Sequence, residues 1–391
     1  MFGHAGRSSN REVNVLRTDH LDGRCPFLPS PDGLDEAPLA YAPGEEDVQI
    51  AVLGCGYWGS KHVRVLQGLA EVERVIAVDQ DVDRLISLQK ALPGLTSRTR
   101  LEDALDEIDA VVVATPPRSH APIAMRILEA GKHALVEKPL ATSSAEAREL
   151  VATAESRGLT LMVGHTFEHN PAVWKLRELV ESGVVGDVLY VDSARLNLGL
   201  YQPDVNVIWD LAPHDISIFN FVLRSAPSSV HAWGSMHGHR SLEDVAYLRL
   251  SYPDLDVTAH IHVSWLDPCK VRRVTVVGSE RMVVYNDLAT EERIRVFDKG
   301  LVARSEADAE TQAPTSYRYG DISSPFVPFE EPLLIQDRLF VQAVSDGLGP
   351  VAAPHPGVLV VDVLECAERS LREGRQVSLD EVQPQAPVEV G

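Results

Sequence analysis

A glycine-rich turn and a later carboxylate are the first groups in this chain whose types and spacing suggest chemistry. The turn, Gly54-Cys55-Gly56-Tyr57-Trp58-Gly59, has the G-x-G-x-x-G spacing and stands between an apolar run and an amphipathic stretch. Such a turn lets the backbone approach a pyrophosphate and directs helix N–H groups at it. Asp79, 20 residues beyond Gly59, is placed to bind ribose hydroxyls and would repel a 2'-phosphate. We therefore predict NAD rather than NADP, bound by Gly54, Gly56, Tyr57, Trp58, Gly59 and Asp79; the alternative is a turn whose glycines serve packing alone.

Lys138, Asp210 and His214 could carry out acid/base chemistry. Lys138 follows the apolar run His133 to Val136, at the sheet edge where ligands of parallel sheets collect. Asp210 and His214 are four residues apart, so a helix would place both on one face and let the carboxylate orient the imidazole. A histidine near its ordinary pKa can accept a proton from an alcohol at neutral pH. The alternatives are a surface lysine, and a capping aspartate beside a partly buried histidine.

Other polar residues near these positions complete the predicted site. His165 could border a cleft, and Arg195, Asn197 and Tyr201 could hydrogen-bond a substrate. We expect His120 to start a helix near the cofactor. The remaining predicted cofactor-binding residues follow two apolar runs: Thr115, Pro116, Glu137 and Lys138.

The string His165-Thr166-Phe167-Glu168-His169 has the H-x-x-E-H pattern of some zinc peptidases. It follows the apolar run Leu159 to Val163 and precedes Pro171, so we expect an extended segment rather than a helix. Four residues along a strand would separate the two imidazoles by about 13 Å, too far for one zinc ion. We therefore predict no metal site.

The elements that must position these residues follow two different sequence patterns. From residue 48, apolar runs alternate with amphipathic stretches as far as residue 164, which predicts a parallel sheet covered by helices on both faces. Beyond residue 164, alternating strands follow each other with few helices between them, which predicts a largely antiparallel sheet. The expected organisation is a poorly ordered leader over 1–47, a doubly wound NAD-binding domain over 48–164, a substrate-binding and oligomerisation α/β domain over 165–380, and a tail over 381–391.

Composition excludes several classes of protein. The chain has 391 residues with 57 acidic and 36 basic side chains, a net charge of −21, which would repel nucleic acid and anionic membranes. Its four cysteines are widely spaced, as expected of reduced thiols rather than a disulfide framework. It has no signal-peptide pattern and no long apolar run, so we expect a cytoplasmic protein that contacts neither nucleic acid nor membrane.

The chain resembles the Gfo/Idh/MocA family of pyridine-nucleotide oxidoreductases, which act on sugars and cyclitols. The resemblance covers about residues 48 to 379 and lies in the glycine-rich turn and in four further stretches: Ala114-Thr115-Pro116, Glu137-Lys138-Pro139, Gly183-Val184-Val185-Gly186, and Asp210 through Asp215. It implies a Rossmann domain followed by an α/β domain with an open sheet, in a homo-oligomer (a dimer or tetramer). It also implies that Lys138 is the active-site lysine, His214 the acid/base and Asp210 its companion. Within the family, Leu196-Asn197-Leu198-Gly199 together with Ala212 to Ser217 resembles the nucleotide-sugar 3-dehydrogenases most.

The sequence therefore predicts an NAD-dependent oxidation of a secondary alcohol of a sugar, at carbon 3 of a nucleotide-linked hexose. His214 would take the hydroxyl proton, while Lys138 would hold the same oxygen and stabilise its developing charge. Alternatives are the reverse ketoreduction of a nucleotide-linked deoxysugar, a dehydrogenase of a free sugar or cyclitol, and a non-catalytic regulator that senses NAD.

Overall fold

The computed structural model describes residues 48–199, 201–238, 241–302, 316–347 and 355–383. The predicted leader over 1–47 and most of the predicted tail lie outside these residues.

The first sheet is parallel, with six strands in the order β3-β2-β1-β4-β5-β6. This is the Rossmann strand order. Strands are added on one side of β1 up to β3 and on the other side from β4 onward, and this switch leaves a crevice at the carboxyl ends of β1 and β4. The strands are β1 (Val48–Leu53), β2 (Val72–Val78), β3 (Thr96–Arg98), β4 (Ala110–Val113), β5 (His133–Glu137) and β6 (Leu161–Gly164). The sequence did not predict β3, whose three residues are too few for a recognisable pattern.

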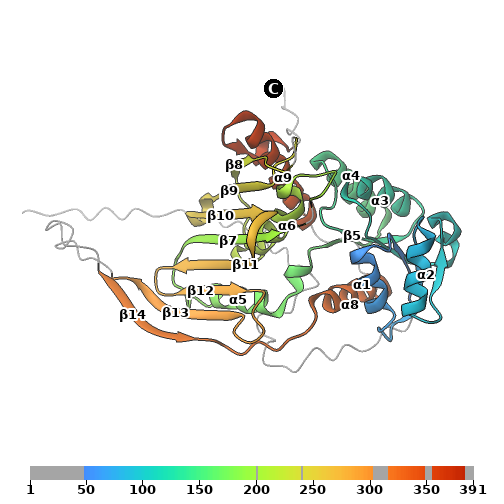
Figure 1. Ribbon diagram of the computed structural model, residues 1–391, viewed down its shortest axis with the longest axis horizontal. Coiled ribbons are helices and arrows are strands. Elements are labelled where there is room, and N and C mark those ends of the chain that lie inside the picture. The colour runs from blue at the N-terminus through green and yellow to red at the C-terminus, as the bar shows by residue number, and fades with distance from the viewer. Residues whose placement is uncertain (1–47, 200, 239–240, 303–315, 348–354, 384–391) are drawn as a thin grey trace, which may run out of the picture.

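Helices cover both faces of this sheet, as the continuous apolar strands require. Side chains of one face, such as Ile50 and Val112, pack with α1 (Tyr57–Leu66), α2 (Val82–Ala91) and α8 (Pro332–Ser345). Side chains of the other face, such as Ala51 and Val111, pack with α3 (His120–Glu129) and α4 (Ser144–Arg157). Helix α8 lies beside α1 although it comes from the far end of the chain (Figure 1).

The second sheet has nine strands in the order β14-β13-β12-β11-β7-β10-β9-β8-β15. Neighbouring strands are antiparallel except for β7 and β10, which are parallel, so the predicted open and largely antiparallel sheet is confirmed. The strands are β7 (Val188–Leu198), β8 (Ser229–Ser235), β9 (Val245–Tyr252), β10 (Val257–Ser264), β11 (Leu266–Gly278), β12 (Met282–Asn286), β13 (Ile294–Leu301), β14 (Tyr317–Ser323) and β15 (Val377–Ser378).

Three helices pack on one face of the second sheet: α5 (Pro171–Glu181), α6 (Val207–Leu223) and α9 (Pro356–Glu373). Short 3-10 helices fill some connections: Leu101–Asp103, Leu105–Glu107, Pro117–Ser119, Thr166–His169, Pro253–Leu255 and Leu379–Glu381. Figure 1 shows the two sheets side by side, with α6 between the second sheet and the carboxyl end of β5. Helix α6 therefore brings its side chains to the crevice of the first sheet.

Candidate active site

The turn after β1 requires glycine at the two ends of its motif. Gly54 has a φ of +90°, and a β-carbon there would lie 2.6 Å from the carbonyl oxygen of Ala114. A β-carbon on Gly59 would overlap the carbonyl oxygen of Gly54. Helix α1 then begins at Tyr57 after Gly56, which offers no side-chain cap, so the first N–H groups of the helix are available to a phosphate. These features fit the pyrophosphate of a dinucleotide.

Asp79 lies against the same turn. Its Oδ2 accepts a hydrogen bond of 2.7 Å from the backbone N–H of Cys55, and its Oδ1 accepts one from Asp81. Arg84, which is half exposed, places Nη1 3.6 Å from Asp79 Oδ2. Burial and then the Asp79 charge raise the pKa of the Cys55 thiol to about 12, so this thiol stays protonated.

The loops after β4 and β5 are joined by His120. Its ring nitrogens each lie 2.7 Å from a carbonyl oxygen, that of Pro139 for Nδ1 and that of Thr115 for Nε2. His120 begins α3, as expected, and is buried. The histidine thus fixes the segment beginning with Thr115 and Pro116 against the segment that carries Lys138.

Lys138 is held at the carboxyl end of β5 by residues of α6 and the second sheet. Its ammonium donates to the carbonyl oxygen of Asp210 at 2.6 Å and lies 3.4 Å from Asp210 Oδ1. The other carboxylate oxygen of Asp210 accepts a 2.9 Å hydrogen bond from the indole N–H of Trp265, which is buried. The lysine side chain is 11% exposed, so the site can exclude most water from the ammonium.

His214 lies one turn further along α6 and is partly buried. Its Nδ1 has no hydrogen-bond partner among the described residues, and its ring meets that of Phe167 edge to face at 5.0 Å. Burial, and then the charges of Lys138 and Arg195, lower the pKa of His214 well below its usual value. The imidazole is therefore neutral at pH 7 and can accept a proton, although a pKa near neutrality was expected.

The expected pairing of Asp210 with His214 is wrong. The carboxylate turns to Lys138 and Trp265 instead. Helix α6 starts at Val207, where the Asn206 side chain caps it by accepting from the N–H groups of Ile208 and Trp209. Pro213 consequently lies in the second turn of the helix.

The predicted substrate-binding residues Arg195 and Asn197 of β7, and Tyr201 beyond it, all have protein partners. Arg195 is buried and forms a two-bond ion pair with Asp215, at 2.7 and 3.1 Å. Asn197 Oδ1 accepts from Arg272 at 2.9 Å. Tyr201 donates to the carboxylate of Asp244 at 3.2 Å. The amide nitrogen of Asn197 has no hydrogen-bond acceptor among the described contacts. It can therefore donate to a ligand.

His165 follows β6 and has no hydrogen-bond partner on either ring nitrogen within the described part of the chain. It is 3% exposed, and burial together with nearby histidines lowers its pKa to about 3. The extended conformation expected after His165 is wrong, because Thr166–His169 forms a 3-10 helix and Asn170 then caps α5. Among the described residues, no group of three His, Cys, Asp or Glu side chains is arranged to hold a metal ion.

A buried charge cluster behind Lys138 was missed by the sequence reasoning. His62 of α1 places Nδ1 2.9 Å from Asp337 of α8, and Nε2 3.1 Å from Glu137. Burial alone would lower the pKa of His62, but the two carboxylates outweigh burial and raise it to about 10. His62 and Asp337 are 275 residues apart, so the available sequence signal was a histidine on the apolar face of α1.

Two family models match the chain. One is described as an oxidoreductase family with an NAD-binding Rossmann fold and matches residues 48–165; the other is the GFO/IDH/MocA C-terminal domain and matches residues 173–284. The chain belongs to the Gfo/Idh/MocA family of oxidoreductases. Its first domain is therefore the NAD-binding Rossmann domain of that family, and the resemblance seen in the sequence is confirmed.

Individual relatives of the family agree with this assignment. The crystal structure of GenD2 from gentamicin A biosynthesis, in complex with NAD, is 28% identical, with a TM-score of 0.73, covering 88% of this chain and 99% of that one. Inositol 2-dehydrogenase of Rhizobium meliloti is 25% identical over 85% of this chain and 99% of its own length. UDP-N-acetylglucosamine 3-dehydrogenase of Acidithiobacillus ferrooxidans is 28% identical over 48% of this chain. The chain spans little more than half the length of several curated relatives, 58% in this last case.

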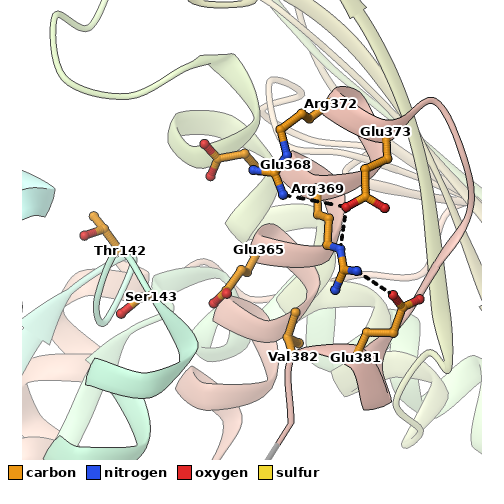
Figure 2. A pocket seen from close by; sticks show the side chains of 9 residues that line it. All are labelled: Thr142, Ser143, Glu365, Glu368, Arg369, Arg372, Glu373, Glu381 and Val382. Atoms are coloured by element: carbon orange, nitrogen blue, oxygen red, sulfur yellow. Dashed lines mark hydrogen bonds and ion pairs between the residues drawn. The ribbon is translucent and has the colours of Figure 1, made fainter.

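Two further observations concern the rest of the surface. None of the helices in the described ranges is long and apolar enough to cross a membrane. Figure 2 shows a hollow between the start of α4 and helix α9, whose lining does not include Lys138. Its charged residues pair with one another, as Arg369 does with Glu373 and Glu381, so we assign no ligand to it.

Proposed function

We propose that this protein is an NAD-dependent dehydrogenase that oxidises a secondary alcohol of a sugar, at carbon 3 of a nucleotide-linked hexose. The observation that carries the proposal is the hydrogen bond from Lys138, at the carboxyl edge of the NAD-binding sheet, to Asp210, which lies one helical turn before His214 on α6. Lys138 is held by Asp210, and His214 is neutral with an unpartnered ring nitrogen in the described structure. Such a pair can bind an alcohol oxygen and take its proton.

The residues divide the work on the substrate hydroxyl. Bound NAD supplies the acceptor for the hydride that leaves the substrate carbon. Lys138 donates a hydrogen bond to the hydroxyl oxygen and stabilises the negative charge that develops there. His214 accepts the proton, and Asp210 with Trp265 keeps the ammonium in place. The closed surroundings of both groups strengthen these interactions, because little water screens them.

The relatives point to two classes of substrate. The UDP-N-acetylglucosamine 3-dehydrogenase and the gentamicin A biosynthesis protein support a nucleotide-linked or amino-sugar substrate. The inositol 2-dehydrogenase, which matches over nearly its whole length, supports a free cyclitol as the second candidate. We favour the nucleotide-linked sugar because Leu196-Asn197-Leu198-Gly199 and Ala212 to Ser217 are most similar to that branch.

The test is NADH formation, followed at 340 nm, with UDP-N-acetylglucosamine, N-acetylglucosamine or myo-inositol as substrate. We expect kcat/KM with NAD to be at least about tenfold higher for the nucleotide sugar. The Lys138→Met variant serves as the blank for each substrate. Turnover of myo-inositol alone would favour the cyclitol, and NADH binding without turnover of any alcohol would favour a regulator.

We also propose that the protein is a homo-oligomer. Large apolar side chains are exposed on the second sheet away from its helices, among them Trp233, Tyr247 and Leu198, at 48%, 38% and 75% exposure. Trp233 and Tyr247 stack, with ring centroids 5.7 Å apart. Contiguous apolar surface of this kind commonly marks an interface. Light scattering coupled to size-exclusion chromatography should give a dimer or tetramer, and a monomer would contradict the proposal.

A further inference from the structure

Arg272 of β11 lies beside the candidate active site without a role in the proposed chemistry. It pairs with Arg195 across β7 and β11, so its side chain lies on the same face of the sheet as Arg195, toward α6. Its guanidinium donates to the carbonyl oxygens of Leu196 and Val271, at 3.0 and 2.9 Å, and to Asn197 Oδ1 at 2.9 Å. Its charge also acts on His214. Arg272 is therefore within electrostatic range of the reacting groups.

All three of these hydrogen-bond acceptors are neutral. Within the part of the chain that the structure describes, Arg272 forms no ion pair, whereas the nearby cations each have one. Lys138 has Asp210 and Arg195 has Asp215. Asp287 directly follows β12, the neighbour of β11. Its carboxylate accepts a hydrogen bond from the Tyr285 hydroxyl and lies 4.0 Å from Arg293. The carboxylates of Asp215, Asp287 and Asp210 act on Arg272 only from a distance, so its guanidinium has no carboxylate bonded to it among the described residues.

Burial makes the positive charge of Arg272 energetically unfavourable. Burial, and then the neighbouring Arg195 guanidinium, lower the pKa of Arg272 to about 10. A half-buried cation next to another cation is unfavourable unless an anion compensates it. Support of the strand irregularity between Leu266 and Val271 would need hydrogen-bond donors but no charge, and an uncharged amide could supply them more cheaply.

The guanidinium also retains hydrogen-bonding capacity. It has five N–H donors, and the three contacts leave two of them. The Asn197 amide uses its oxygen on Arg272 and faces Gly199, where a β-carbon would overlap the amide nitrogen. Glycine at 199 thereby leaves room for that nitrogen beside Arg272. Two kinds of donor, one charged and one neutral, therefore converge on the same edge of the site.

We propose that Arg272 and Asn197 form a subsite for an anionic group of the substrate. The inference rests on the proposed function and narrows its substrate class to sugars that carry a phosphate or a carboxylate. The chemistry shared by these sources is an oxyanion that accepts hydrogen bonds from a guanidinium. Its charge balances that of the guanidinium, and its position fixes the sugar relative to Lys138 and His214.

The test measures anion binding without turnover. The full-length protein is saturated with NADH, which occupies the dinucleotide site, and is titrated calorimetrically with UDP, inorganic pyrophosphate or glucuronate. For at least one of these probes, Arg272→Gln should raise the Kd about 10- to 100-fold, because charge-assisted hydrogen bonds are lost. Arg273→Gln is the matched control, since Arg273 is exposed on the opposite face of the same strand, and it should bind as the unmodified protein does.

A second variant guards against misfolding of the first. Asn197→Asp keeps Arg272 but places a carboxylate against its guanidinium, and it should weaken anion binding to a similar degree. Loss of UDP and pyrophosphate binding identifies a diphosphate, and loss of glucuronate binding identifies a carboxylate. Absence of binding for all three probes, or equal Kd values for Arg272→Gln and the unmodified protein, would overturn the subsite. The proposed function is judged separately, by NADH formation.

Discussion

Replacing His62 by glutamine removes the imidazolium that lies between two buried carboxylates. His62 is completely buried, as is Asp337, and Glu137 is 6% exposed. A pKa raised from 6.5 to about 10 corresponds to about 5 kcal/mol of stabilisation when the imidazole is protonated. Breaking a buried ion pair by removing one partner costs about 3–5 kcal/mol. We therefore expect His62→Gln to lower the unfolding free energy by about 3–5 kcal/mol where the imidazole of the unmodified protein is protonated.

The direction of the pH dependence is fixed by the raised pKa. The contribution of His62 is fully present below about pH 6.5, its ordinary pKa, and is lost as the pH rises toward 10. Urea unfolding followed by tryptophan fluorescence at pH 6.5, 8 and 9.5 measures it. The unmodified protein should exceed His62→Gln in unfolding free energy most at pH 6.5 and least at pH 9.5.

His169→Gln is the matched control for this series. His169 is also buried, but burial lowers its pKa to about 4, so it is neutral throughout this pH range. Its variant should therefore differ from the unmodified protein by a constant amount. A His62→Gln difference below about 1 kcal/mol at pH 6.5, or one that does not change by pH 9.5, would refute the charged cluster.

Four further predictions concern catalysis, the cofactor and the glycine-rich turn. His214→Asn should lower kcat by about 10²- to 10⁴-fold and abolish an acidic limb that lies below pH 6.5, because the pKa of His214 is lowered; if Lys138→Met erases that limb instead, lysine is the base. Asp79→Ala combined with Gln80→Arg should shift the ratio of kcat/KM values from NAD toward NADP, and an unmodified protein that already prefers NADP would contradict the role of Asp79. Gly56→Ala should keep the melting temperature, since its β-carbon meets only Arg84 Nη1 at 3.9 Å, but weaken NADH binding in a fluorescence titration. Gly59→Ala should lower the melting temperature as well, because its methyl group overlaps Gly54, and an unchanged value would contradict the tight turn.

The first sheet could be predicted because its signals are local. Apolar runs, the glycine-rich turn and Gly158, which ends α4 with a φ of +64°, each depend on a few neighbouring residues. The start of α4 is marked just as locally, because the side chain of Ser143 caps the helix by accepting from the N–H of Glu146. The second sheet was predictable in type but not in order, because its strand order depends on pairings between segments far apart in the chain.

The contacts of the candidate site were less predictable than its residues. The spacing of Asp210 and His214 indicates a shared helix face, and this is where they lie, yet spacing cannot tell which neighbour a carboxylate bonds. Trp265 and Lys138 come from other parts of the chain, and they take up the two carboxylate oxygens of Asp210. The 3-10 helix after His165 was missed because a four-residue turn has no period to detect. The cluster of His62, Glu137 and Asp337 joins three segments, so no local pattern could reveal it.

Helix α8 also affects how the chain is made. Phe340 and Val341 of α8 are buried in the same apolar cluster as Ile50, Val52 and Leu66 of the first sheet and its helix. More than 170 residues separate the end of β6 from Phe340, and at 5–20 residues per second a ribosome takes roughly 10 to 35 s to add them. The nascent NAD-binding half waits through this interval with part of its apolar face uncovered. The apolar face of the first sheet is therefore covered only when α8 has been synthesised, although the strands of that sheet are translated first.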